Sequence, residues 1–220
     1  CGIMAQFAVA VGRKDHAVLL ACDTLAYEHV PFRSEGLKLI IGNTNKRRGL
    51  VDSEYNARRA QCAEAVERLR RRYPELTLLG ELGAREFADA ADLIDDDVVR
   101  RRARHVIEEN ARVLQSVEAL KNDRFDEFGR LMNASHESLQ RLFEVSCFEL
   151  DVMVEEARKI DGVLGSRMTG AGFGGCTVSL VREESVDHFI EQVGANYRAR
   201  TGLEPAFYVA DIGDGVREIN

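Results

Sequence analysis

The spacing of apolar residues changes twice along this chain and divides it into a strand-rich start, a long helical middle and a mixed end. Alternation with a period of two predicts strands, whereas spacings of three and four predict helices. The predicted strands are Ala17–Cys22, Leu25–Phe32, Leu37–Gly42, Val163–Met168, Cys176–Val181 and Ala206–Ala210. The predicted helices are Glu54–Tyr73, one running through Val99–Leu120, one opened by Asp123, one near Glu149–Lys159, and Glu184–Arg198.

Local signals fix the ends of the longer elements. Ser53 is placed to cap the first long helix and Pro74 to end it. The apolar positions of that helix form one stripe, expected to face the core: Ala60, Ala63, Val66, Leu69 and Tyr73. The first two strands are expected to pair through a tight turn at Asp23-Thr24.

The order of elements from Leu37 onward predicts the fold class. Without the extra middle helices it reads β-α-β-β-α-β, which is the split βαβ pattern of ferredoxin-like sheets. We therefore predict an α+β fold, a ferredoxin-like split βαβ domain with inserted helices. The one plausible boundary before it is Arg33-Ser34-Glu35-Gly36.

Composition narrows the class of protein. Lys and Arg number 30 against 37 Asp and Glu, and this net charge of −7 argues against general nucleic-acid binding. No apolar run approaches the roughly 20 residues that a membrane span requires. The five cysteines are scattered and include no C-x-x-C pair, which indicates free thiols in a reducing compartment. We expect a cytoplasmic protein with neither nucleic-acid nor membrane partners.

The remaining charged and titratable residues give weaker signals. The five histidines fall in unrelated elements, without a Ser or Cys nucleophile in a partner motif, so a His-dependent hydrolase is not expected. The arginine runs 70–72 and 100–102 are interpreted as solvated helix faces, because acidic residues lie nearby at similar density.

The segment Arg167–Cys176 is the strongest local signal. Gly170, Gly172 and Gly175 match G-x-G-x-x-G, but the dinucleotide motif requires a helix directly after the loop, and a strand pattern follows here. The lysine of a P-loop is absent as well. Two interpretations stay open: a tight turn between strands, or a loop whose bare backbone N–H groups approach an anionic group or a neighbouring domain.

Three segments together resemble a known family: Cys1–Phe7, Asn43–Arg59 and Ser166–Cys176. They are similar to blocks of the galactokinase family of GHMP kinases, and shorter stretches between them agree in family order. The similarity covers essentially the whole chain. It implies a two-lobed kinase that transfers the γ-phosphate of ATP to the anomeric hydroxyl of D-galactose with Mg²⁺, in a site between the lobes.

The resemblance also implies how this chain divides. Residues 1–35 correspond to the tail of the N-terminal GHMP domain and residues 36–220 to the C-terminal domain. The family's galactose signature, ATP loop, Mg²⁺ ligands and catalytic arginine are expected upstream of Cys1, so no metal ligand is expected in this chain. The partners implied are galactose, ATP and the missing N-terminal lobe of the same protein.

Site residues carry over position by position. Gly2 resembles a glycine that contacts the sugar, and Tyr55 the tyrosine whose hydroxyl reaches a galactose hydroxyl. The glycine motif expected beside the substrate and phosphates comprises Gly170, Gly172, Gly174 and Gly175. The family's catalytic aspartate falls at position 5, where this sequence has Ala5.

Ala5 changes the functional expectation. A carboxylate that takes or orients the proton of a sugar hydroxyl contributes roughly 10²–10⁴-fold to the rate, and a methyl group does neither. This form is therefore predicted to be inactive while retaining ligand binding. The alternative is a galactokinase-like sensor of galactose and ATP that acts by protein interaction. A related kinase acting on another sugar or on mevalonate is disfavoured by the Asn43–Arg59 block.

Overall fold

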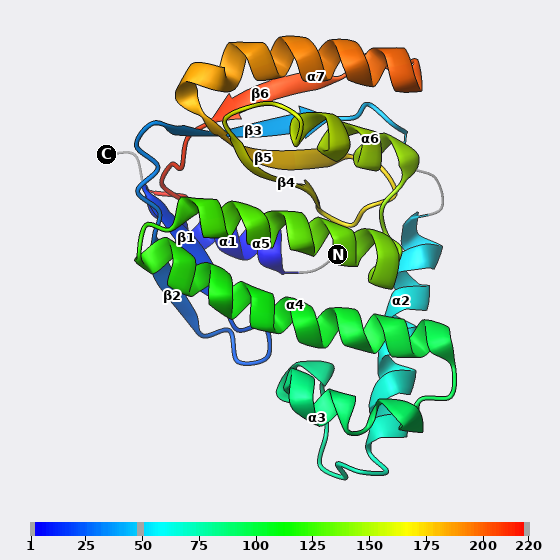
Figure 1. The fold of residues 1–220 in the computed structure, drawn as a ribbon. Helices are drawn as coiled ribbons and strands as arrows, with labels where there is room; N and C mark the ends of the chain where they lie inside the picture. The colour runs from blue at the N-terminus through cyan, green and yellow to red at the C-terminus, as the bar shows by residue number, and fades with distance from the viewer. Residues whose placement is uncertain (1–2, 48–50, 218–220) are drawn as a thin grey trace.

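The architecture is that of a four-stranded antiparallel sheet covered by helices on both faces (Figure 1). The structure is a computed structural model and describes residues 3–47 and 51–217. The helices are α1 Met4–Val11, α2 Val51–Leu69, α3 Ala84–Ala88, α4 Asp97–Lys121, α5 Phe125–Ser138, α6 Phe148–Ala157 and α7 Val186–Thr201. The strands are β1 His16–Leu20, β2 Tyr27–Pro31, β3 Leu37–Asn43, β4 Val163–Thr169, β5 Cys176–Arg182 and β6 Ala206–Ala210.

The main sheet confirms the predicted fold class. Its strands lie in the order β4-β5-β3-β6, and each neighbouring pair is antiparallel. Numbered from β3 along the chain, this order is the one that a split βαβ unit gives. The inserted helices α2 to α6 lie between β3 and β4, and α7 connects β5 to β6.

The two faces of the sheet bury different helices. Ile40 and Val181 point to one face and pack with Val152 and Met153 of α6 and Phe189 of α7. The positions one residue away, Leu39 and Leu180, point to the other face, where α4 and α5 pack. The alternation along each strand is therefore explained by helical layers on both sides.

The first segment forms a small unit of its own. Strands β1 and β2 pair as a two-stranded sheet, with His16 opposite Pro31. The predicted tight turn at Asp23-Thr24 is wrong, because the strands are shorter than expected and a six-residue loop, 21–26, joins them. Leu25 adopts a left-handed conformation there, with φ +60°, and its N–H donates to the carbonyl of Ala21 at 2.8 Å.

The residues after β6 return to this first segment. The N–H of Gly215 donates to the carbonyl of Gly12, and that of Val216 to the carbonyl of Val9, both at 2.8 Å. The N–H of Lys14 donates to Asp214 Oδ1 at 2.9 Å. The C-terminal run 212–216 thus holds the end of α1.

A second core lies away from the sheet, at the lower end of the molecule in Figure 1. It joins α2, α3 and α4 through the connecting residues 76–94, which include the short turns η1 Leu79–Glu81 and η2 Ala91–Leu93. The predicted stripe on α2 is partly wrong, because Ala65 is buried there in place of Ala60 and Ala63, which are exposed. The helix also begins at Val51, so that Ser53 lies inside it and does not cap it.

The start of α5 differs from the prediction in one detail. Asp123 lies before the helix in a left-handed conformation, with φ +53°, and α5 begins at Phe125. Its C-terminus runs into a π turn, η3 Leu139–Phe143, before α6. Residues Leu139 and Phe143 of this turn line a cavity of the candidate functional site.

Candidate functional site

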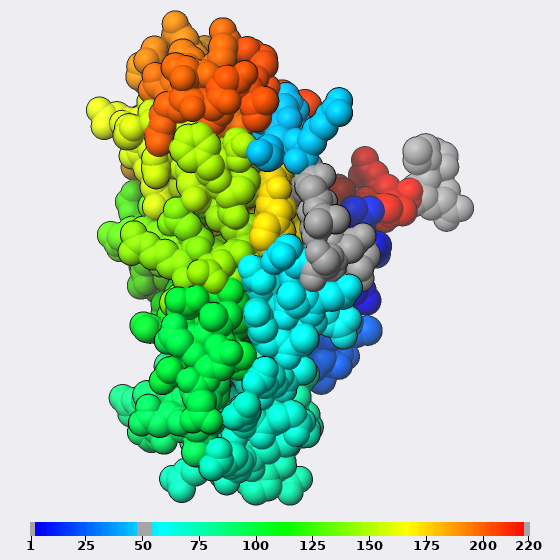
Figure 2. Space-filling model, turned by 90° about the vertical axis from the view of Figure 1, so that its right-hand side faces the viewer, coloured from blue at the N-terminus to red at the C-terminus, as the bar shows by residue number. Residues whose placement is uncertain are grey.

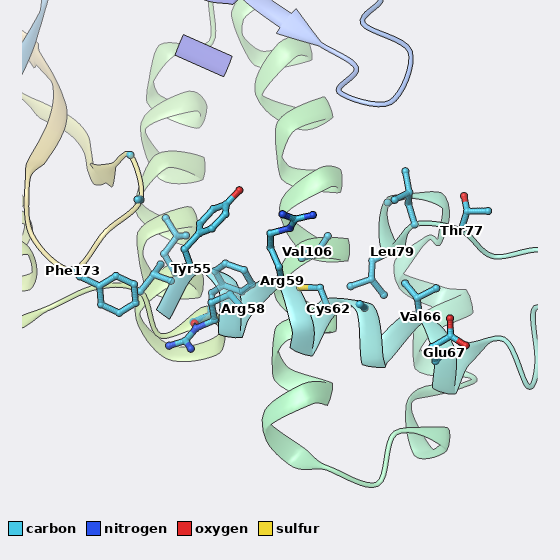
Figure 3. Close-up of a pocket in the computed structure, with 18 of the residues that line it drawn as sticks. Tyr55, Arg58, Arg59, Cys62, Val66, Glu67, Thr77, Leu79, Val106 and Phe173 are labelled. Carbon is cyan, nitrogen blue, oxygen red and sulfur yellow. The ribbon is translucent and has the colours of Figure 1, made fainter. Parts of the chain in front are cut away.

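Two cavities meet at the glycine loop, which joins β4 to β5 (residues 170–175). The α2 cavity has a volume of about 640 Å³, and its wall includes Tyr55, Cys62, Val66, Leu79, Val106 and Phe173 (Figure 3). The α1 cavity has a volume of about 710 Å³, and its wall includes Met4, Ala17, Glu109, Arg112, Arg167 and Thr169. Gly170 lies in the wall of both cavities.

The α2 cavity brings Tyr55 and the glycine loop together. Tyr55 is 42% exposed on the first half of α2, and Gly170, Ala171 and Phe173 contribute to the same wall. Most of the lining is apolar, and Arg58, Arg59 and Arg70 also contribute to the wall. Figure 2 shows this side of the molecule, where the start of α2 (cyan) reaches the end of the sheet that carries the glycine loop (yellow).

The glycine loop follows a strained path. Gly170, Gly172, Phe173, Gly174 and Gly175 all have positive φ values. At Gly172, φ is +85° and an added Cβ would lie 2.0 Å from the carbonyl oxygen of Val145, so only glycine fits. The N–H groups of Gly170 and Ala171 make no backbone hydrogen bond to the described residues, which leaves them available to a ligand.

The glycines therefore divide by role. Gly172 and Gly174 are buried, and the carbonyl of Gly175 accepts from the N–H of Thr44 at 2.9 Å and from its hydroxyl at 2.6 Å. These positions hold the loop against the rest of the domain. Gly170 and Ala171 are exposed and face the cavities.

The α1 cavity has a charged end built on Glu109. This carboxylate of α4 accepts hydrogen bonds from the Ser135 hydroxyl and from Arg112, and Arg167 Nη1 lies 3.7 Å from it. Burial lowers the pKa of Arg167, and Glu109 acts against that shift. Two guanidinium groups share one carboxylate here, so this end of the cavity keeps a positive charge.

Ala5 lies on α1 beside the α1 cavity. Its neighbour Met4 lines that cavity, and Ala5 itself is exposed. The helix is apolar along its length yet buries no side chain among the described residues, with Met4 64% and Val9 57% exposed. Gly2 lies outside the described residues.

A second group of arginines holds the π turn η3. The guanidinium of Arg102 is only 3% exposed, pairs with the Glu144 carboxylate, and donates from Nη1 to the carbonyl of Leu142 at 2.5 Å. The interpretation of residues 100–102 as a wholly solvated face is therefore wrong for Arg102. Its hydrogen bond also lowers the pKa of Glu144.

The buried histidines serve the framework. His136 Nδ1 accepts from the N–H of Met168 at 3.2 Å, and its Nε2 lies 3.3 Å from Asp151 Oδ1. Ser146 donates its hydroxyl to the same carboxylate at 2.5 Å, and not to the imidazole. Both ring nitrogens of His136 are thus occupied, so this imidazole is held as part of the framework.

His105 is held in a different way. Its Nδ1 lies 2.8 Å from the Ser138 hydroxyl, and its ring stacks on Phe143 with centroids 4.5 Å apart. Burial lowers the pKa of His105 to about 4. The imidazole is therefore neutral at pH 7.

Neither a cluster of metal-ligand side chains nor a helix able to span a membrane is found among the described residues. No group of three or more His, Cys, Asp or Glu side chains gathers there as metal ligands. Within the same residues, no helix combines the length and apolar character needed to cross a bilayer.

The structure thus places the predicted site residues in two linked groups. Tyr55 shares a cavity with Gly170, and Gly170 shares the other cavity with the neighbour of Ala5. Arg58, Glu109 and Arg167 were not among the predicted site residues. One available signal was the position of Arg167 directly before the Met-Thr-Gly segment; another was Arg58 lying one helical turn after Tyr55.

Comparison with known proteins gives a consistent result. Residues 116–199 match the family model described as GHMP kinases C terminal. The chain is 50% identical over 220 residues to the galactokinase of Clostridium acetobutylicum, and 49% identical over 219 residues to that of Bacillus subtilis. All of this chain is covered in each case, but it spans only 56% of the length of those relatives.

Solved structures show the same relationship. The crystal structure of Lactococcus lactis galactokinase complexed with galactose superposes with a TM-score of 0.94 and 44% identity, over 98% of this chain and 55% of that one. Mevalonate kinase of L. major superposes with a TM-score of 0.55 at 18% identity, over 91% of this chain and 50% of that one. The second likeness concerns the fold alone.

Proposed function

Since this chain belongs to the GHMP kinases, we propose that it forms the C-terminal part of a kinase that phosphorylates galactose at its anomeric hydroxyl with ATP. We further propose that the present form, with alanine at position 5, binds its ligands without turning them over. The observation that carries this proposal is the shared cavity of Tyr55 and Gly170. It supports a ligand held between a phenolic hydroxyl and a glycine loop with available N–H groups.

The residues then take separate roles. Tyr55 orients the sugar through a hydrogen bond from or to its hydroxyl. Gly170 and Ala171 present backbone N–H groups to the reacting phosphate region, where such donors favour negative charge. Gly2 is proposed as a further sugar contact. Gly172, Gly174 and Gly175 hold the loop in the required path.

The second half of the site is proposed to come from an N-terminal lobe. The exposed apolar residues Met4 and Val9 of α1 support this, because exposed apolar surface marks sites of interaction with another domain. We propose that this N-terminal lobe supplies the Mg²⁺ ligands. We also propose that the complete enzyme is cytoplasmic. ATP with Mg²⁺ supplies the transferred phosphoryl group and neutralises its charge. We place the boundary between the lobes at residues 35 and 36.

Position 5 decides whether turnover occurs. In phosphoryl transfer the protein mainly positions the reactants, and a carboxylate that accepts the proton of the attacking hydroxyl completes the site. Ala5 offers only a methyl group. A sugar bound beside it would keep its proton, so binding and chemistry are separated in this form.

The test compares the complete polypeptide that carries this chain with its Ala5→Asp variant. We expect both to bind galactose by calorimetry, and the variant to phosphorylate galactose roughly 10²–10⁴-fold faster. Normal turnover by the alanine form would refute the assigned role of position 5. Absence of galactose binding in both forms would refute the proposal that galactose is the substrate.

A second candidate function rests on the same residue. With no carboxylate at position 5, the protein is suited to sense galactose and ATP and to act by binding another protein. The Ala5→Asp variant separates the two functions. Recovery of phosphorylation indicates a disabled enzyme, whereas binding of galactose with continued inactivity indicates a sensor.

A further inference from the structure

Arg58 lies between the two elements that form the proposed sugar site. It is one helical turn after Tyr55 on α2, and its side chain is only 11% exposed. Its Nε donates to the carbonyl of Phe143 and its Nη2 to the carbonyl of Glu144, each at 2.7 Å. Its Nη1 lies 3.2 Å from Glu54 Oε2. Each of the three guanidinium nitrogens therefore has a partner, which fixes the orientation of the group.

Those two carbonyls close the π turn η3. Glu144 ends the turn in a left-handed conformation, with φ +53°. A helical end leaves carbonyls without partners inside the helix, and cations near it are favoured. Arg102 takes the carbonyl of Leu142, so three consecutive carbonyls are held by two guanidinium groups from two helices.

The next residue connects the turn to the glycine loop. The carbonyl of Val145 accepts from the N–H of Phe173 at 2.8 Å, and it lies where a side chain on Gly172 would be. The ring of Phe173 also lies under Arg58, with its centroid 5.8 Å from Arg58 Cζ, within cation–π range. Arg58 thus contacts the glycine loop directly through the Phe173 ring and holds it indirectly through the π turn that precedes Val145.

We propose that Arg58 is a positioning residue that fixes the glycine loop relative to Tyr55, so that galactose binding depends on a side chain that does not touch the sugar. The inference rests on the proposed function, since it assigns Tyr55 and the loop to one ligand. The planar guanidinium suits this role because it donates to two adjacent carbonyls at fixed angles. An ammonium group on a flexible stem cannot hold both in that way.

Arg59 provides a matched control. It is the adjacent residue, lines the same cavity and is exposed, yet its side chain has no hydrogen bond or ion pair to any described residue. In Figure 3 its guanidinium lies on the other side of α2 from that of Arg58. Substitution of either arginine removes one positive charge from the cavity, but only Arg58 holds the loop.

The first measurement is galactose affinity by calorimetry, with the complete polypeptide and its Arg58→Gln, Arg58→Lys and Arg59→Gln variants. Loss of charged hydrogen bonds to two carbonyls is expected to raise Kd about tenfold or more in Arg58→Gln. Arg58→Lys keeps the charge over Phe173 and is expected to recover part of the affinity. Arg59→Gln is expected to change Kd less than about twofold.

The second measurement does not depend on galactose. Hydrogen exchange of the Phe173 amide, followed in a peptide covering residues 169–175, reports the bond to Val145 directly. Arg58→Gln is expected to accelerate that exchange about tenfold, while peptides from β5 stay unchanged. Arg59→Gln is expected to leave both peptides unchanged. If Arg58→Gln does not fold, Arg58→Lys takes its place.

The outcomes separate the inference from the proposed function. Faster local exchange together with weaker galactose binding supports the positioning role. Unchanged exchange in folded Arg58 variants, or equal acceleration throughout the sheet, overturns it. If the parent polypeptide does not bind galactose, the proposed function fails, and the exchange at Phe173 alone decides whether Arg58 holds the loop.

Discussion

Gly165 of β4 lies directly against the backbone of Gly129 of α5. A Cβ atom on Gly165 would come within 2.2 Å of the Gly129 carbonyl oxygen and 2.6 Å of its Cα. Helix α5 and strand β4 therefore meet backbone to backbone, and β4 is the strand that leads into the glycine loop. This contact sets the depth at which α5 sits on the sheet.

Gly165→Ala is expected to lower the free energy of unfolding by about 2–3 kcal/mol, as overpacking in a core does. The clash involves backbone atoms, so rotation of a side chain cannot relieve it. Chemical denaturation measures the change. Gly213→Ala is the control, because a Cβ there meets no atom within 4 Å. Equal stability of the two variants would show that α5 can move away from β4 at little cost.

Arg102→Met is expected to destabilise the protein by about 2–4 kcal/mol. The change leaves the Leu142 carbonyl and the Glu144 carboxylate without the Arg102 guanidinium, and that loss exceeds the desolvation cost that an apolar side chain avoids. Arg71→Met is the control, since the side chain of Arg71 is exposed and has no hydrogen bond or ion pair to the described residues. Thermal and denaturant melts of both variants test this. A similarly small loss of stability in both variants would mean that the fold does not depend on Arg102.

Acid is expected to weaken the fold through His105. Burial lowers its pKa to about 4 in the folded protein, against an ordinary value of 6.5. Between these values the unfolded chain binds more protons, so the free energy of unfolding rises with pH. The contribution is complete above about pH 6.5 and is lost as the pH falls towards 4. It amounts to about 3 kcal/mol, at 1.36 kcal/mol for each pKa unit.

The measurement is a series of denaturant titrations from pH 4 to pH 8 with His105→Gln. This variant is expected to lose the part of the pH dependence that belongs to the imidazole. His188→Gln, at an exposed position of α7, serves as control and is expected to follow the parent curve. Parallel curves for the parent and His105→Gln would rule out His105 as the source.

Tyr55→Phe tests the proposed sugar contact. Removal of the hydroxyl is expected to raise the galactose Kd about tenfold without lowering stability, because the ring is half exposed. With the complete polypeptide, titration calorimetry measures the galactose Kd and scanning calorimetry measures the stability. Tyr208→Phe, on exposed strand β6, is the matched control. Unchanged galactose affinity in Tyr55→Phe would show that the Tyr55 hydroxyl does not contact the sugar.

The sheet was predictable because its strands carry strong local patterns. Leu37–Asn43 and Cys176–Arg182 alternate between two buried faces, and the glycines between β4 and β5 mark their connection. The short helix α3 was missed, since its five residues are too few to show a period. The left-handed Asp123 and Leu25 carry no glycine signal, so the loops around them could not be placed from sequence.

The site was predictable only in part. Tyr55 and the glycine motif were assigned through resemblance, and of that motif only Gly170 lines the cavity of Tyr55. The burial of Arg102 was missed because its partner Glu144 lies 42 residues further along the chain. A solvated arginine and a buried one look alike in sequence until the fold brings such a partner close.

The return of residues 212–216 to α1 has a practical consequence for engineering. Three main-chain N–H groups, from Lys14, Gly215 and Val216, tie this last run to the helix that carries position 5. Residues 212–216 therefore act as a tether for α1. Removing these residues, or fusing a bulky tag close to Val216, would loosen the helix that carries position 5.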